Sequence, residues 1–360
     1  MDIKVISEQE LIEYLRTLPP VAGSFLQTPW WYKLMRTSKD QAEYLGIYLG
    51  EKMVGVATTI VHTVYPGLCF AYAPRGPIVV KKDHLRQAVE ALRDFWKKRG
   101  VFYLRVEPVA LDMVGQDIGR QEEKRFLPRG FHKIYDTQPS MSVVIDLEKS
   151  EEELMKVMHQ KTRYNIHLAE KKDLHFRWAS LKDFDIFWQL LQYTAARSHF
   201  RPHAFTHYHN LLKDIKPEGF SNEDLGVRLV VVEHQGETLA SCVEIACLGV
   251  VTYLHGSSSR FHTDLKAPHL LHWRMIQAAK AAGFKFYDFW GVQTDAKKYP
   301  DWAGFTRFKL GFSQRPVKYL GSFDYVYNWS LYIGYRLGHT LNNWLWWSKK
   351  LWRRLSVGSN

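Results

Sequence analysis

Histidines are the first residues in this sequence whose type and spacing could do chemistry, because imidazole nitrogens bind metal ions. The chain of 360 residues has 16 of them, and two groups are close in sequence: His269 with His272, and His203 with His207 and His209. Neither group forms the HExxH pattern of zinc hydrolases, and no cysteine pair accompanies either one. We therefore expect no metal site.

Cysteine and serine nucleophiles are also poorly supported. Cys69, Cys242 and Cys247 are the only cysteines, and they form no CxxC pair. A disulfide scaffold is therefore not expected, and a reducing cytoplasm is the simplest location. The sequence has no GxSxG motif, so it offers no nucleophile elbow for a covalent acyl intermediate.

The charge balance indicates an anionic partner. Lys and Arg number 49 against 37 Asp and Glu, which gives a formal charge of +12. RNA, a phosphorylated metabolite and an anionic membrane surface are all compatible with this excess. The first twenty residues lack the apolar core of a signal peptide, and no segment has the ~18 consecutive apolar residues of a membrane span.

The elements that would position functional residues occur twice. The first copy has paired strands at 43–63, a strand at 67–74, a helix at 84–100 and a strand at 101–108. The second copy has paired strands at 227–247, a strand at 250–257, a helix at 268–283 and a strand at 284–292. Each helix ends at a glycine, Gly100 or Gly283, as C-cap chemistry favours. Duplication is preferred over coincidence, and Tyr72 is taken to correspond to Tyr253.

Between the copies, the pattern predicts one amphipathic helix at 150–173, with a capping box formed by Ser150 and Glu153. Two further helices are expected at 182–200 and 203–215. No Pro/Gly/Ser linker divides the chain, so the halves should pack against each other.

The repeated order of three strands, a helix and a strand is that of N-acetyltransferases which use acetyl-CoA. We therefore predict an α/β (α+β) protein with two tandem acetyltransferase-like (GNAT-type) domains at 1–145 and 146–328. In such folds, glycines in the loop before the helix let backbone N–H groups hold pyrophosphate. The corresponding loops, 75–83 and 257–268, have no Gly-x-Gly. Coenzyme A is therefore not supported as the acyl donor.

Six segments together carry a resemblance to a known family. They are YAPRGPI (72–78), KTRYNIHLA (161–169), YTAARSHF (193–200), YLHGSSS (253–259), YDFWGV (287–292) and GFTRFKLGF (304–312). In this order they resemble the Fem (FemABX) family of non-ribosomal peptidyltransferases, and the resemblance spans about residues 20–328.

The resemblance implies two GNAT-like domains that share a cleft, and transfer of an amino acid from aminoacyl-tRNA. The implied acceptor is the side-chain amine of the third stem-peptide residue in a peptidoglycan precursor, either lipid II or a UDP-linked muropeptide. Aminoacyl-tRNA would be a co-substrate, with no cofactor. Some members carry a coiled-coil arm, but no heptad run here is long enough for one. We expect a monomer.

The implied reaction is aminolysis of an ester, in which a fixed cation near the developing oxyanion lowers the barrier. Lys309 matches the family's Phe-Lys position and is the candidate oxyanion stabiliser; the alternative is a surface lysine. Phe308 would shape the aminoacyl or adenosine pocket, or pack in the core.

Three basic residues are candidates for binding phosphate groups of a substrate. Arg197 lies where the family carries a phosphate-binding arginine, and a planar guanidinium suits phosphate oxygens. Its alternative is an exposed helical arginine. Arg201 is a nearby substitute, and Lys33 is a candidate second phosphate contact, although the spacing around it is imperfect.

Tyr72 and Tyr253 end equivalent strands, either lining a substrate pocket or packing in the core. Arg75 either faces carboxylates and phosphates of the precursor or braces its own loop. Asp288 is conceivable as a general base, and a structural hydrogen-bonded aspartate is the preferred alternative.

The tail, 329–360, has no acidic residue and five tryptophans. On a helix, Trp344, Leu345, Trp347, Leu351, Trp352 and Leu355 gather opposite the basic residues. This pattern is typical of a helix lying in an anionic membrane surface, and the alternative is a helix packed on the body. It favours a cytoplasmic protein on the inner face of the plasma membrane.

Rival functions remain open. The same fold could serve an N-acyltransferase that uses acyl-CoA, which tight coenzyme A binding would support. A non-catalytic tRNA- or membrane-binding protein is the second rival. Transfer to a protein N-terminus or to a lipid is the third.

Overall fold

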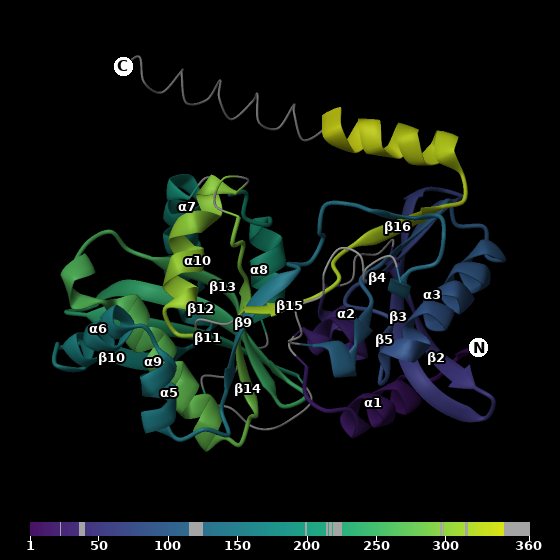
Figure 1. Ribbon diagram of the computed structural model, residues 1–360. Helices are drawn as coiled ribbons and strands as arrows, with labels where there is room; N and C mark the ends of the chain where they lie inside the picture. The colour runs from purple at the N-terminus through teal and green to yellow at the C-terminus, as the bar shows by residue number, and fades with distance from the viewer. Residues whose placement is uncertain are drawn as a thin grey trace, which may run out of the picture.

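The computed structural model describes residues 1–21, 23–35, 40–114, 125–198, 200–213, 215, 218, 225–295, 297, 299–313 and 316–341. Its strands form two sheets, one in each half of the chain, and helices pack on both (Figure 1). The first half (purple to blue) lies on the right of Figure 1, and the second (green) lies on the left.

The first half contains the first predicted unit. Its elements are β1 (Asp2–Val5), α1 (Glu8–Thr17), η1 (Ser24–Gln27), α2 (Pro29–Met35), β2 (Asp40–Leu49), β3 (Lys52–Tyr65), β4 (Leu68–Ala73), β5 (Ile78–Val79), α3 (Lys82–Lys97), β6 (Tyr103–Val106), β7 (Val109–Ala110), η2 (Leu111–Met113) and β8 (Phe131–Lys133). β2, β3 and β4 are antiparallel neighbours, and α3 crosses over so that β6 pairs in parallel with β4.

The second half repeats this topology. Its elements are β9 (Met141–Asp146), α5 (Glu151–Val157), α6 (Gln160–Glu170), β10 (His175–Ala179), η3 (Leu181–Asp183), α7 (Phe184–Arg197), α8 (Phe205–Leu212), β11 (Leu225–His234), β12 (Glu237–Cys247), β13 (Val250–Ser258), η4 (Thr263–Leu265), α9 (Ala267–Ala281), β14 (Phe286–Gly291), η5 (Pro300–Trp302), α10 (Ala303–Leu310) and β15 (Pro316–Lys318). β11, β12 and β13 are antiparallel neighbours, and β14 pairs in parallel with β13. The predicted α/β class and duplicated unit are confirmed.

The helices form where apolar spacing and caps predict them. In α3, the residues expected on one face are all buried, from Leu85 to Trp96. Gly100 and Gly283 follow α3 and α9 with φ of +72° and +82°. Such left-handed angles favour glycine, because a Cβ atom would be strained there.

The single helix predicted at 150–173 is wrong. The capping box of Ser150 and Glu153 starts α5, but Met158 is extended and the chain restarts at α6. At the break, the His159 backbone N–H donates to the Gly311 carbonyl at 2.8 Å. This contact lies 152 residues away in the numbering, so local periodicity could not predict it.

The register of the closing strands corrects the proposed match between the two tyrosines. Tyr72 pairs with Arg105 on β6, five residues after Gly100. The residue five positions after Gly283 is Asp288, and its partner on β13 is Thr252. Tyr72 is therefore equivalent to Thr252, and Tyr253 lies one residue further along its strand.

Two strands complete the sheets. β9 pairs with β14 in the second sheet, although the predicted first domain extends to residue 145. After the second unit, β16 (Phe323–Val326) returns to the first sheet and pairs with β6 and β8. The first sheet therefore uses residues from both ends of the described chain.

A helix at 329–341 follows β16 and is drawn in yellow, extending across the top of Figure 1. Tyr332 donates to Asp324 at 2.8 Å, and the Tyr335 ring lies 5.5 Å from that of Phe70. These contacts attach the helix to the first half. The apolar face predicted between 344 and 355 lies outside the described residues. Within the described ranges, no helix has the length and apolar character needed to cross a bilayer.

Candidate functional site

A cavity of about 780 Å³ opens where β13 and β14 separate. The two strands pair only from Val250 to Thr252, opposite Phe286–Asp288. Beyond that point β13 runs on to Ser258, and residues of α7, α9 and α10 line the gap. All lining residues belong to the second half, from Asn165 to Lys309.

Lys309 projects from α10 into this cavity. Its side chain is largely buried, and Nζ donates a hydrogen bond to the Gly291 carbonyl at 2.9 Å. The ammonium lies over two rings, 5.4 Å from the centre of Tyr253 and 5.3 Å from that of Phe305. The sequence alternative of a surface lysine is therefore wrong, because the side chain is enclosed among aromatic residues.

Burial sets the ionisation of this lysine. Loss of hydration lowers the pKa of Lys309 from 10.5 to about 7, while the nearby charge of Asp288 acts in the opposite direction. An amine with such a pKa exchanges its proton readily near neutral pH. In its charged form it is a cation at the wall of a water-poor cavity, where electrostatic stabilisation is strong.

Asp288 is fully buried behind Lys309. Its Oδ1 accepts hydrogen bonds from the Ser142 hydroxyl and, at 2.9 Å, from the Trp290 backbone N–H. Its Oδ2 is buried and has no hydrogen-bond partner among the described residues. Burial raises the pKa of Asp288 above its usual value. The carboxyl is held by the backbone, as the structural alternative predicted, and it also acts electrostatically on Lys309.

Phe308 lies between two cavities. Besides lining the first, it lines a second cavity of about 710 Å³, together with Asn165 and His269. The Phe308 ring is 5.1 Å from that of His269, and Asn165 Nδ2 lies 3.1 Å from His269 Nε2. These three side chains form a wall between two spaces, an arrangement suited to two substrates that meet at one point.

Arg197, in the last turn of α7, reaches the rim of the first cavity. Its guanidinium donates to the carbonyl and hydroxyl oxygens of Ser258, each at 3.3 Å. Burial, and secondarily the charge of Arg260, lowers the pKa of Arg197. No carboxylate is paired with this guanidinium in the described structure, so its charge is available to an anionic group.

A hydrogen-bonded chain runs from the cavity wall into the sheet. His272, which lines the cavity, has Nδ1 3.0 Å from the Tyr287 hydroxyl. That hydroxyl also hydrogen-bonds Glu244 Oε1 at 3.1 Å, which continues the chain into the sheet. Burial lowers the pKa of His272 well below its usual value, which favours the neutral ring. Burial also raises the pKa of Glu244 to about 8.

Of the other predicted site residues, Tyr253 lines the cavity, while Lys33 and Arg201 do not. Lys33, on α2, is exposed and pairs with Glu8 at 2.5 Å. Arg201 is exposed on the segment between α7 and α8.

Tyr72 and Arg75 lie in the first half, away from the cavity. Tyr72 is buried, and its hydroxyl lies 3.3 Å from Gln138 Nε2. Arg75 is buried between the halves: its guanidinium stacks 3.7 Å from the Tyr319 ring centre and donates to the Pro139 carbonyl at 2.6 Å. These contacts favour the bracing alternative for Arg75 over a direct contact with substrate.

Sequence reasoning selected none of Asn165, His269, His272 and Glu244 as site residues. Asn165 lies in a quoted motif, KTRYNIHLA, and its position among basic residues gave no sign that it faces a cavity. The two histidines were considered only as metal ligands. Glu244 is an acidic residue within an otherwise apolar part of its strand. A buried acid of this kind was the signal that could have identified a functional group.

The start of α9 has one backbone donor fewer than an ordinary helix N-terminus. Lys266 precedes the helix with φ of +59°, and Pro268 lies in the first turn. Proline has no N–H, so the turn loses one of the donors that would hold an anion. This geometry agrees with the absence of glycines noted in the sequence.

Comparison with known proteins places this fold. The crystal structure of FemX superposes with a TM-score of 0.74 at 19% identity, covering 92% of this chain and 99% of that one. A tandem GNAT protein from the clavulanic acid biosynthesis pathway superposes with a TM-score of 0.52 at 11% identity, over 90% of this chain and 97% of its own. Two GNAT-like units in one chain, with a cavity at the strand separation of the second, define a tandem GNAT-like fold.

The sequence comparisons narrow this class. A lipid II:glycine glycyltransferase of Staphylococcus saprophyticus is 21% identical over 373 residues, covering 86% of this chain and 90% of the relative. The sequence profile of the FemAB family matches residues 6–218 and 228–340. The chain belongs to the FemAB family.

Proposed function

We propose that this protein is an aminoacyltransferase that takes an amino acid from aminoacyl-tRNA. The proposed acceptor is the stem-peptide side-chain amine of a peptidoglycan precursor, and the lipid-linked form is preferred over the UDP-linked one. The observation that carries this proposal is a buried, unusually acidic lysine, Lys309, in the cavity of a FemAB-family chain. Its relative from Staphylococcus saprophyticus, named for glycyl transfer to lipid II, supports the choice of acceptor.

The chemistry requires no covalent enzyme intermediate. The acceptor amine attacks the carbonyl carbon of the aminoacyl ester, a C–N bond forms, and the C–O bond to the tRNA ribose breaks. The proton lost by the amine ends on the released ribose oxygen. Lys309 in its ammonium form, at the cavity wall, stabilises the tetrahedral oxyanion.

The two substrates would enter the two cavities divided by Phe308. Arg197, at the rim of the first cavity, would contact phosphate of the tRNA acceptor end, and Arg201 and Lys33 would add weaker contacts. Lys33 would have to leave Glu8 to do so. A phosphate bound at Arg197 would replace the neutral oxygens of Ser258 with anionic acceptors, which a guanidinium can bind in a bidentate manner.

The tail helix would hold the enzyme at the inner face of the plasma membrane. Trp329, Ile333, Leu337 and Leu341 recur every four residues and are exposed, whereas Tyr332 and Tyr335 face the body. Such a stripe suits the interface of an anionic bilayer. Replacing Ile333 and Leu337 by Ser should lower the binding of the full chain to vesicles containing anionic lipid by about 100-fold or more, since each buried apolar side chain contributes ~1.5–3 kcal/mol. Unchanged binding would argue against this membrane contact.

The decisive experiment incubates the full chain with mixed labelled aminoacyl-tRNAs and lipid-linked precursor, and follows the precursor by mass spectrometry. We expect a mass increase of one or more amino acids. The product should be absent with Lys309→Met and present with Lys285→Met, a control in the same half whose exposed lysine pairs with Glu148. No increase with either precursor form would refute the proposal.

A further inference from the structure

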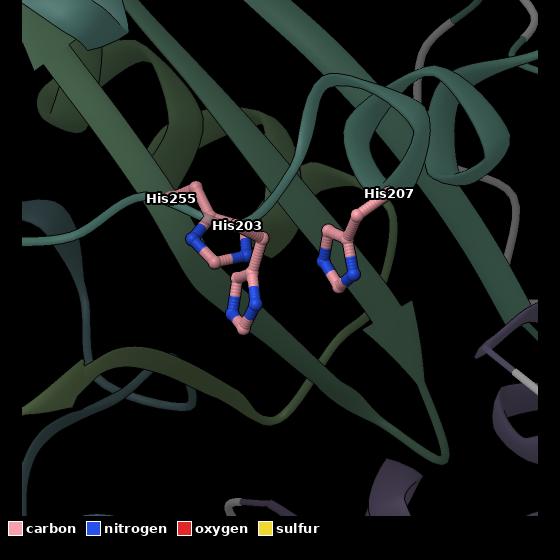
Figure 2. A group of neighbouring side chains, drawn as sticks. All are labelled: His203, His207 and His255. Carbon is pink, nitrogen blue, oxygen red and sulfur yellow. The ribbon is translucent and has the colours of Figure 1, made fainter. Parts of the chain in front are cut away.

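Three histidine side chains meet beside the cavity that holds Lys309. His203 precedes α8, His207 lies within α8, and His255 lies on β13 and lines the cavity. One ring nitrogen from each lies within 4.8 Å of those of the other two (Figure 2). The mechanism proposed above uses none of these side chains.

This group differs from the histidines that are adjacent in sequence. His209, which the sequence associates with His203 and His207, turns away, and its ring packs 5.4 Å from Phe184. The third member of the group is His255 on β13, which the fold brings next to the start of α8. The sequence argument against a metal considered only local spacing, and therefore it did not test this set.

The spacing is close to that of a metal site. Zinc binds imidazole nitrogen at ~2.0–2.1 Å, which places the nitrogens of a tetrahedral site roughly 3.4 Å apart. A separation of up to 4.8 Å must therefore shorten to this value on binding. The rings of His203 and His207 are now stacked at 4.1 Å, so one of them must rotate away from the stack on binding.

The polar state of the rings also suits a metal. The Nε2 atom of His207 is buried and has no hydrogen-bond partner within the described structure, which is costly for an imidazole nitrogen. A nitrogen without a hydrogen-bond partner can bind a metal ion in the neutral form of the ring.

Residues around the three histidines both favour and oppose the binding of a metal ion. The buried ring of Tyr208 contacts all three imidazoles, at centroid distances of 5.0 to 6.1 Å, and limits their movement. Arg201 carries a positive charge near His203, and this charge opposes a cation. Arg201 is exposed, so water and salt screen its charge.

We propose that His203, His207 and His255 form a three-histidine site for Zn²⁺ that ties α8 to β13 at the rim of the cavity. Because His203 is exposed, the fourth position is open to water. The tie fixes the chain that follows Arg197 and so keeps this rim in place. The three histidines take no part in the chemical step of the proposed transfer reaction.

The test uses the full chain, stripped of metal by chelator and titrated with Zn²⁺ against a chromogenic competitor. We expect one Zn²⁺ per chain and a higher melting temperature with the metal. His203→Asn/His207→Asn should weaken binding by about 100-fold or more, since loss of groups that merely support ligands already costs 10–100-fold. His209→Asn, on the same helix and outside the group, should bind as the wild type does.

Two measurements guard against a folding defect. His203→Asn alone changes an exposed side chain, and it should weaken Zn²⁺ binding without lowering the melting temperature of the metal-free protein. Co²⁺ added to the wild type should give the visible absorption of a nitrogen-ligated tetrahedral ion. Equal Zn²⁺ binding by wild type and the double variant, or an equal loss in His209→Asn, would overturn the proposal.

Discussion

The closing strands of the two repeated units carry a charged residue at the same position, but only the charge in the first unit is fully paired. In the first unit Arg105 forms two hydrogen bonds with Asp324 on β16, at 2.8 and 2.9 Å. In the second unit Asp288 has Val144 opposite it on β9 and keeps one oxygen unpaired near Lys309. One fold thus contains a satisfied ion pair in one copy and an unsatisfied charge in the other.

This difference indicates that the first unit contributes mainly to stability and the second to chemistry. A buried charge without a full set of partners costs stability, and proteins retain such groups at functional sites. The first unit is closed by β16 and carries the tail helix, while both large cavities described above lie in the second. We infer that the first unit acts as the scaffold and that the second performs the reaction.

The largest expected effect concerns the first unit. Arg105→Met should lower the free energy of unfolding by about 3–5 kcal/mol, because it leaves the buried carboxylate of Asp324 without its cation. Chemical denaturation measures this change. Arg86→Met, which removes a surface pair with Glu90, should cost at most about 0.5 kcal/mol. If the correctly folded Arg105→Met protein also had lower transfer activity than the folded wild type, a scaffold role for the first unit would be contradicted.

The second prediction concerns Lys309. Lys309→Met should lower kcat for transfer by about 100- to 1000-fold, the usual cost of losing an oxyanion partner. It should not lower the melting temperature at pH 7. Because the pKa of Lys309 is lowered on folding, burial of its charge costs stability below about pH 7, and this cost fades between pH 7 and 10.5. A strongly destabilised variant would show that Lys309 is structural.

A smaller effect is expected at the cavity rim. Arg197→Gln should raise KM for aminoacyl-tRNA by about tenfold with little change in kcat, since one phosphate contact is lost. Arg274→Gln, an exposed arginine on α9, is the matched control. An equal fall in kcat with unchanged KM would place Arg197 in the chemistry instead of in donor binding.

The smallest effect is a shift in pH dependence. Transfer should decline as pH rises through about 7, where Lys309 loses its proton. The charge of Asp288 raises the pKa of Lys309, so Asp288→Asn should move this decline to lower pH by about one unit or less. The profile of kcat/KM measures the shift, and a decline that moves upward would mean that the two groups are not coupled in this way.

The duplicated fold could be predicted because its signals are local. Strand alternation, turn glycines and the apolar face of α3 occur within short segments, and they occur twice. Lys309 was found because its neighbours match a family motif, and no periodicity marks it. Three features depend on contacts between distant segments, and local patterns could not predict them. They are the break before α6, the proximity of His255 to His203 and His207, and the cavity wall formed by Asn165 and His269.

The return of β16 to the first sheet affects how the protein folds as it emerges from the ribosome. Arg105 and its partner Asp324 are 219 residues apart in the chain. At ~5–20 residues per second, the nascent first domain waits roughly 10–40 s for its last strand. Until then β6 has an unpaired edge, so the N-terminal domain cannot finish folding first, and a truncated product ending before residue 323 would be a target for proteolysis.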